Sequence, residues 1–210
     1  MPKTRAPLYV GIAIVAILVG ALSAQFVKVP RQPDLQLANG TLLPAPRAVP
    51  EFQLVDGSGN AYGHAQLTGH WSVLFFGYTS CPDICPITLT TLAQVDTQLA
   101  DLPATQRPQI VFVSVDPQRD TPAQVGQYVK FFSPDFIGLT GEPGKIEPFT
   151  QAMGVPVAIH DSGNGAYTVD HAATLFLLDP QARMTAIFSP PHSVATLASD
   201  LRSVVGRLEQ

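Results

Sequence analysis

Two runs dominated by apolar, aromatic and β-branched residues mark the predicted centre of the fold, at residues 71–78 and 109–116. Such runs are typical of strands that are buried on both faces of a sheet. Between them, residues 84–100 have apolar side chains at helical spacing, which predicts an amphipathic helix. A strand, a helix and a strand of these lengths predict a parallel pair of strands joined by a right-handed crossover.

Shorter patterns predict the remaining elements. Helical spacing recurs in three segments, 122–132, 142–153 and 194–209. Three apolar clusters predict short strands, near Phe52, Ile137 and Val157. The segments 173–179 and 184–188, separated by a ProGlnAlaArg turn, predict an antiparallel hairpin. Together these elements predict an α/β fold with a central mixed β-sheet flanked by helices.

An uncharged segment at residues 8–24 precedes this pattern. A helix of this length reaches about 26 Å, slightly less than the roughly 30 Å of a bilayer's hydrocarbon core. We therefore predict one N-terminal transmembrane helix, a membrane anchor over residues 1–26. The alternative is a cleaved signal peptide, because Lys3 and Arg5 give a basic start and small residues end the segment. Both interpretations place the rest of the chain outside the cytoplasm.

Prolines recur between the apolar segment and the first predicted strand. This composition predicts an extended linker over residues 27–45, followed by one folded domain over 46–210. The domain is acidic: beyond residue 31 the chain has all 16 acidic residues but only 8 of its 12 basic ones, a formal charge of −8. Such a domain repels nucleic acid and anionic lipid surfaces, so we expect no nucleic-acid partner.

Cys81 and Cys85 are the chain's only cysteines, and they are too close in sequence to staple a domain of this size. They lie in ThrSerCysProAspIleCysPro, where the first buried strand gives way to a helix. If the helix begins within this motif, both sulfurs share one face and can bind one metal or form a disulfide. The helix N-terminus would then favour thiolate over thiol. The alternative is a pair of small buried hydrophobes.

His171 is the candidate third ligand, because it directly precedes a predicted buried strand. Two thiolates and one imidazole form a soft set that suits Cu(I), and a nearby oxygen would complete a tetragonal arrangement for Cu(II). A structural zinc site would need a fourth protein ligand. The other histidines are interpreted as surface or satisfied core residues: His64, His70, His160 and His192.

Three motifs make the chain resemble the Sco/SenC family of copper chaperones that assemble cytochrome c oxidase. They are TyrThrSerCysProAspIleCysPro (78–86), SerValAspProGlnArgAspThrPro (114–122) and AspHisAlaAlaThrLeuPheLeuLeuAspPro (170–180). The resemblance covers roughly residues 45–208 and implies a thioredoxin-like fold. It also implies that Cys81, Cys85 and His171 are the copper ligands.

The resemblance further implies a function and a location. The domain would deliver copper to the binuclear copper site of cytochrome c oxidase subunit II, or keep that site's cysteines reduced. It would be a single-pass protein of a bacterial inner membrane with its domain in the periplasm. Other periplasmic copper chaperones and thiol reductases are further expected partners.

Several charged residues near the predicted site are candidates for supporting the ligands. Asp83 and Asp170 would orient His171 or raise the basicity of the nearby ligands, unless they face water. Arg119, with Asp116 or Asp120, would brace the metal loop. The motif around them also suits a purely structural role, since Thr121 followed by Pro122 is a favourable start for a helix.

Two alternative activities use the same cysteines. The first is an extracytoplasmic thiol-disulfide oxidoreductase in which Cys81 and Cys85 cycle between dithiol and disulfide, so reductase activity could accompany or replace the chaperone role. Three intervening residues, where such oxidoreductases generally have two, favour metal binding instead. The second is a peroxidase, which would need an arginine beside the reacting cysteine, and Arg119 is the candidate.

Overall fold

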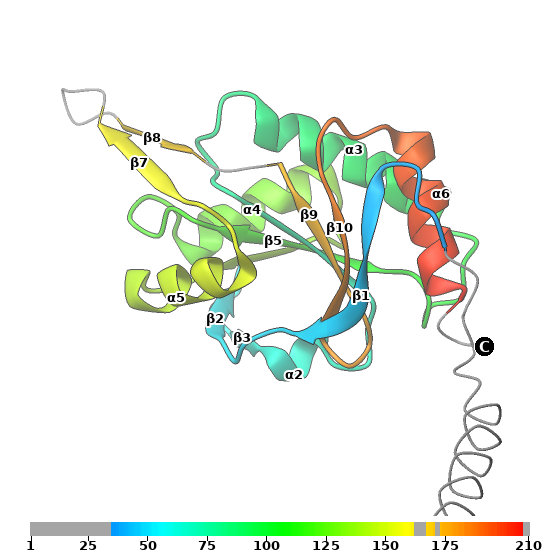
Figure 1. Cartoon of the computed structure of the whole chain (residues 1–210). Coiled ribbons are helices and arrows are strands. Elements are labelled where there is room, and N and C mark those ends of the chain that lie inside the picture. The colour runs from blue at the N-terminus through cyan, green and yellow to red at the C-terminus, as the bar shows by residue number, and fades with distance from the viewer. Residues whose placement is uncertain (1–34, 162–166, 171–172, 208–210) are drawn as a thin grey trace, which may run out of the picture. The chain divides into compact units, whose positions relative to one another are not determined.

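The computed structural model describes residues 35–161, 167–170 and 173–207 (Figure 1). Within these residues eight strands form one mixed sheet. In order across the sheet they are β1 (Gly40–Ala48), β10 (Arg183–Phe188), β9 (Leu175–Leu178), β4 (Ser72–Gly77), β5 (Gln109–Ser114), β6 (Ile137–Thr140), β2 (Gln53–Asp56) and β3 (Ala61–Gly63). The predicted mixed sheet is therefore present.

The centre of the sheet is the predicted parallel unit. β4 and β5 run parallel with Ser72 opposite Gln109 and Gly77 opposite Ser114, and β6 continues the parallel pairing beyond β5. α3 (Ile84–Gln98) connects β4 to β5, and α4 (Pro122–Phe132) connects β5 to β6. The carboxyl ends of β4 and β5 therefore lie side by side, at the edge of the sheet where ligands of α/β proteins usually bind.

Helices cover both faces of this sheet. On one face α5 (Pro143–Met153) packs against β4, where the Phe76 and Phe149 rings lie 5.6 Å apart. On the other face Phe75 meets Phe112, and Phe112 meets Tyr128 of α4. α6 (Val194–Val205) packs beside α3 (Figure 1). Successive residues of a strand point to opposite faces, so β4 is buried on both sides, as its sequence predicts.

Several elements differ from the predicted arrangement. β7 (Ala158–Asp161) is the strand predicted near Val157, but it pairs only with β8 (Tyr167–Asp170) in a separate two-stranded sheet. β3, β8 and the short α2 (His64–Leu67) were not predicted. β8 ends at the residue before His171.

β1 corrects the predicted linker boundary. Residues 40–45 were assigned to the linker because of its prolines, yet they belong to a strand that pairs with β10. β1 is an edge strand whose register shifts between Leu42 and Arg47. Prolines are tolerated at such positions because the edge and the irregularity remove the need for their missing N–H groups.

The predicted membrane anchor, residues 1–26, lies outside the described residues. Within residues 35–161, 167–170 and 173–207, no helix combines the length and the hydropathy needed to cross a membrane.

Candidate metal and thiol site

Cys81 and Cys85 lie between the carboxyl end of β4 and the first turn of α3. The Cys81 backbone N–H donates to the Tyr78 carbonyl oxygen at 3.2 Å, which closes a turn directly after the strand. α3 begins at Ile84, so Cys85 is within the helix and Cys81 precedes it. Cys81 is partly exposed and Cys85 is fully buried. The two thiols thus have different access to solvent, although both follow the same strand.

The Cys85 sulfur packs directly against β4. A Cβ atom added to Gly77 would lie 2.5 Å from Cys85 Sγ and 2.8 Å from the ring of Phe112. Real Cβ atoms do not approach other atoms so closely, so the sulfur occupies the space that a side chain at position 77 would fill. Glycine at position 77 therefore fixes how near the helix can bring Cys85 to the sheet.

The two thiols are electrostatically coupled. A side-chain hydrogen bond with Cys81, followed by burial, raises the pKa of the Cys85 thiol. The expectation that the helix N-terminus would favour thiolate is wrong for Cys85 in the apo state, because these two effects outweigh the partial positive charge of the helix. A metal that binds Cys85 must therefore displace its proton.

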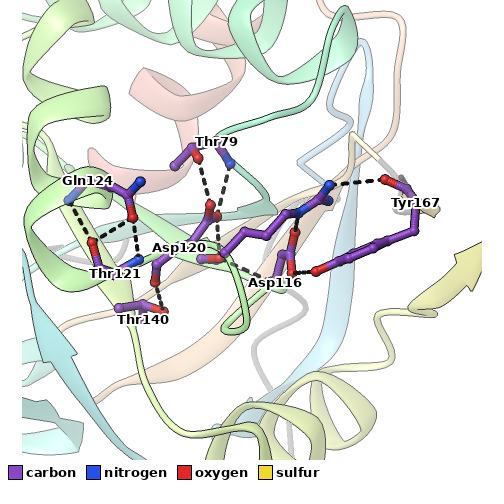
Figure 2. A network of polar contacts seen from close by, with 9 residues as sticks. Thr79, Asp116, Asp120, Thr121, Gln124, Thr140 and Tyr167 are labelled. Atoms are coloured by element: carbon purple, nitrogen blue, oxygen red, sulfur yellow. Dashed lines mark hydrogen bonds and ion pairs between the residues drawn. The ribbon is translucent and has the colours of Figure 1, made fainter. Parts of the chain in front are cut away.

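Asp120 connects the cysteine loop to β5. Its buried carboxylate accepts hydrogen bonds from the Thr79 backbone N–H at 2.9 Å, the Thr79 hydroxyl at 2.6 Å and the Ser114 hydroxyl at 2.6 Å. Its own backbone carbonyl accepts from the Thr140 hydroxyl on β6 (Figure 2). A buried carboxylate with several donors is a firm anchor. Asp120, not Arg119, therefore braces the loop that leads to Cys81.

Asp116 and Arg119 connect the β5 loop to β8. Arg119 Nε donates to one carboxylate oxygen of buried Asp116, and the Tyr167 hydroxyl donates to the other at 2.6 Å (Figure 2). Arg119 Nη1 donates to the Tyr167 carbonyl at 3.1 Å, and the guanidinium lies 3.7 Å from the centre of that ring. β8 is thereby held against the loop that follows β5.

Tyr78 adds a second attachment between β8 and the cysteine loop. Its buried side chain makes a hydrogen bond with the backbone of Val169, and its ring lies 5.6 Å from the Arg119 guanidinium. Burial raises the pKa of Tyr78 in spite of that hydrogen bond. Sequence reasoning missed Tyr78 and Tyr167, because their partners are more than 40 residues away and no local spacing reveals the pairing.

Of the remaining predicted site residues, the structure describes Asp83 and the backbone of Asp170. Asp83 occupies the N-cap position of α3, is exposed, and makes no side-chain cap hydrogen bond. Asp170 ends β8, but its side chain lies outside the described part of the structure, as does His171. Among the described residues, no three His, Cys, Asp or Glu side chains gather to hold a metal. Cys81 and Cys85 are thus the described portion of the predicted ligand set.

A family model described as SCO1/SenC matches residues 41–206 of the chain. The chain belongs to the SCO1/SenC family. The match begins one residue into β1 and ends one residue after α6, so it covers all the described helices and strands except the first residue of β1. This finding confirms the resemblance drawn from the three sequence motifs.

Relatives and solved structures of this family are associated with copper. The chain is 36% identical over 177 residues to a Stutzerimonas stutzeri protein named for copper binding, covering 83% of this chain and 85% of that protein. It is 34% identical to Arabidopsis thaliana ScoI, whose crystal structure has copper bound, with a TM-score of 0.70 over 78% of this chain and 99% of that chain. The chain spans 85% and 43% of the length of the first two curated relatives it matches.

A further SCO1/SenC structure supports the fold alone. BsSco, described as a member of the Sco family of cytochrome c oxidase assembly proteins, is 21% identical, with a TM-score of 0.62 over 80% of this chain and 98% of that chain. The mixed α/β sheet with flanking helices is therefore the thioredoxin-like arrangement of Sco structures.

The described residues fit a soft metal ion. Two sulfur donors that share a hydrogen bond can approach one ion together once their protons leave. Copper bound in an SCO1/SenC relative agrees with this donor type. Cys81 is partly exposed, so an ion in solution can reach its sulfur, whereas Cys85 is buried.

Proposed function

We propose that this chain is a copper metallochaperone whose ligands are Cys81, Cys85 and His171. It delivers copper to the binuclear copper site of cytochrome c oxidase subunit II or reduces the cysteines of that site. The observation that carries the proposal is the coupled thiol pair at the carboxyl edge of the sheet, with one partly exposed and one buried sulfur. The copper-bound structure of an SCO1/SenC relative supports copper as the cargo.

The proposed location follows from the N-terminal sequence. Residues 1–26 anchor the chain in a bacterial inner membrane and the acidic domain lies in the periplasm, where other copper chaperones and thiol reductases are its partners. Extraction of cell membranes with alkaline carbonate tests the anchor: the full chain is expected to remain with the lipid. Release of the uncleaved chain into the supernatant would contradict the anchor.

Thiol-disulfide exchange is the second candidate function. The partly exposed Cys81 thiolate attacks a disulfide of the partner, forming a mixed disulfide and releasing one partner thiolate. Cys85 then attacks Cys81, which releases the second partner thiolate and leaves a Cys81–Cys85 disulfide, so two electrons pass to the partner. The hydrogen bond between the two thiols favours this closure. A peroxidase is disfavoured because Arg119 is held by Asp116 and Tyr167.

One experiment distinguishes delivery from reduction. The copper-loaded, reduced full chain is mixed without oxygen with a soluble subunit II domain, whose cysteines are either reduced or oxidised. Delivery predicts that metal analysis finds copper bound to the reduced partner after the two proteins are separated. Reduction predicts new thiols in the oxidised partner without copper transfer. His171→Ala is the matched variant, because it removes a ligand and retains both thiols. Failure of the wild-type chain in both reactions would contradict the proposal.

Oxidation of the two cysteines should also control copper loading. A Cys81–Cys85 disulfide leaves neither sulfur as a thiolate, so the oxidised chain is expected to bind no copper until a reductant is added. Metal analysis after desalting measures this directly. One copper per oxidised chain would show that the cysteines are not the ligands.

A further inference from the structure

His192 makes a hydrogen bond that its assignment as a turn histidine did not anticipate. It lies in the loop between β10 and α6, and its Nε2 atom is 2.5 Å from the carbonyl oxygen of Ala173. A carbonyl oxygen only accepts, so Nε2 has the proton and donates it. The other ring nitrogen, Nδ1, is buried and has no hydrogen-bond partner within the described structure. The ring is therefore held by this one bond to the backbone.

Ala173, which accepts this hydrogen bond, lies close in sequence to the proposed ligand His171. It is buried, it lies two residues after His171, and β9 begins two residues later. Ala173 lines a cavity of about 400 Å³. Its lining joins the first two turns of α3 to the His192 loop: Ile84, Ile87, Thr88, Thr91, Ala173, Pro190, Pro191 and His192. The chain that follows His171 thus lies beside the helix that contains Cys85.

The loop that presents His192 is itself firmly attached. The Asn39 side-chain amide donates to the Pro191 carbonyl at 2.8 Å. The backbone N–H groups of Ala38 and Asn39 donate to the two carboxylate oxygens of Asp200 on α6, at 2.9 and 3.0 Å. The position of His192 is thereby fixed to both the start of β1 and the last helix. A fixed donor can hold the Ala173 carbonyl in one place.

We propose that His192 is a positioning residue for the copper site. Its hydrogen bond holds the carbonyl of Ala173, two residues after His171, while Arg119 and Tyr78 hold β8, which ends one residue before His171. The inference rests on the proposed function, because it requires that His171 is a copper ligand. Residues that orient metal ligands through such contacts change metal affinity by about 10- to 100-fold when they are removed.

The test uses the full chain and four variants. His192→Ala removes the hydrogen bond, and His192→Gln places an amide N–H near the position of Nε2. His171→Ala is the reference for loss of the ligand, and His70→Ala is the control for removing an exposed histidine. Anaerobic competition with a Cu(I) chelator measures affinity, and electron paramagnetic resonance measures the Cu(II) ligand environment.

We expect His192→Ala to weaken Cu(I) binding by about tenfold and to shift the Cu(II) hyperfine splitting. His192→Gln should recover the wild-type spectrum and most of the affinity, which a merely structural role would not explain. His70→Ala should match the wild-type chain in both measurements. If His192→Ala does not fold, His192→Asn replaces it, because its amide is shorter and should fail to reach the carbonyl.

The outcomes separate this inference from the proposed function. Wild-type affinity and spectrum in the folded His192→Ala or His192→Asn variant, together with copper loss in His171→Ala, overturn the role of His192 and leave the proposed function standing. Wild-type copper binding in His171→Ala overturns the three-ligand site itself, and the positioning role of His192 fails with it.

Discussion

The environment of Cys85 depends on a single position of β4, Gly77. Its sulfur fills the space beside Gly77, and its pKa is raised by Cys81 and by burial. A protonated, buried thiol is unreactive until its proton is lost to a nearby thiolate or displaced by a metal. Cys81, which is partly exposed, is therefore the thiol that is accessible from solvent.

Gly77→Ala is expected to weaken both the fold and copper binding. The new Cβ would meet Cys85 Sγ at 2.5 Å and the Phe112 ring at 2.8 Å. Overpacking of this kind costs about 1 to 3 kcal/mol of unfolding free energy, and it displaces the sulfur. Urea unfolding and Cu(I) competition measure the two effects. Gly144→Ala is the control, because a Cβ there meets no atom within 4 Å; equal behaviour of the two variants would contradict the close packing of Cys85.

Asp120→Asn is expected to destabilise the apo protein by about 2 kcal/mol. The amide presents a donor where the carboxylate accepts from Thr79 and Ser114, and hydrogen bonds to charged groups contribute about 1.5 to 3 kcal/mol. Urea unfolding measures the change. The exposed Asp135→Asn is the matched control and should have little effect. Wild-type stability in Asp120→Asn would show that the cysteine loop does not depend on this anchor.

At the level of single residues, the sequence identifies the thiols but not their surroundings. The spacing of Cys81 and Cys85 and their place after a buried strand are visible in the sequence. The raised pKa of Cys85 depends on burial and on the Cys81 side chain, which only the folded chain determines. The bond from His192 to Ala173 spans 19 residues and has no local signature.

Three segments distant in sequence are joined at the carboxyl edge of the sheet. The loop after β4, the loop after β5 and strand β8 are connected through Asp120, Asp116 and Arg119 (Figure 2). β8 belongs to a two-stranded sheet separate from the main one. Its attachment to the domain therefore depends on these side chains more than on backbone pairing.

Arg119→Lys is expected to loosen β8 without unfolding the domain. Lysine retains the charge but lacks the planar guanidinium, whose separate nitrogens donate to Asp116 and the Tyr167 carbonyl while the group stacks on the Tyr167 ring. Amide hydrogen exchange in residues 167–170 should accelerate by about tenfold, which corresponds to about 1.4 kcal/mol of local stability. Arg107→Lys, which affects the separate pair with Asp96, is the control. Unchanged exchange in β8 would contradict the role assigned to Arg119.

The elements differ in how well their sequences predict them. The helix predicted over 122–132 is confirmed in full, because Thr121 accepts from Gln124 and Pro122 follows at the first helical position. β1 was missed because its prolines resemble a linker when the pairing with β10 is unknown. β8 was missed because its partner β7 and its side-chain anchors are distant in sequence.

The stability of the whole domain should fall in alkaline solution through its buried tyrosines. Burial raises the pKa of Tyr62 to about 12, and within the described structure its hydroxyl has no hydrogen-bond partner. Below about pH 10 both the folded and unfolded states keep the proton. Above it the unfolded chain loses the proton first, so the unfolding free energy decreases by about 1.4 kcal/mol per pH unit until the folded pKa is reached.

Tyr62→Phe is expected to remove this contribution. The difference in unfolding free energy between about pH 9 and about pH 11 should be smaller in the variant by about 1 kcal/mol. Urea unfolding at both pH values measures it. The exposed His70→Ala is the control and should keep the wild-type pH dependence. An unchanged pH dependence in Tyr62→Phe would show that Tyr62 titrates as it does in the unfolded chain.

The most direct test of the account is an anaerobic Cu(I) titration of the reduced full chain against a chromophoric chelator. The account predicts one tightly bound copper per wild-type chain and its loss in Cys81→Ser, Cys85→Ser and His171→Ala, whereas His70→Ala binds as the wild type does. Wild-type affinity in Cys85→Ser or in His171→Ala would contradict it.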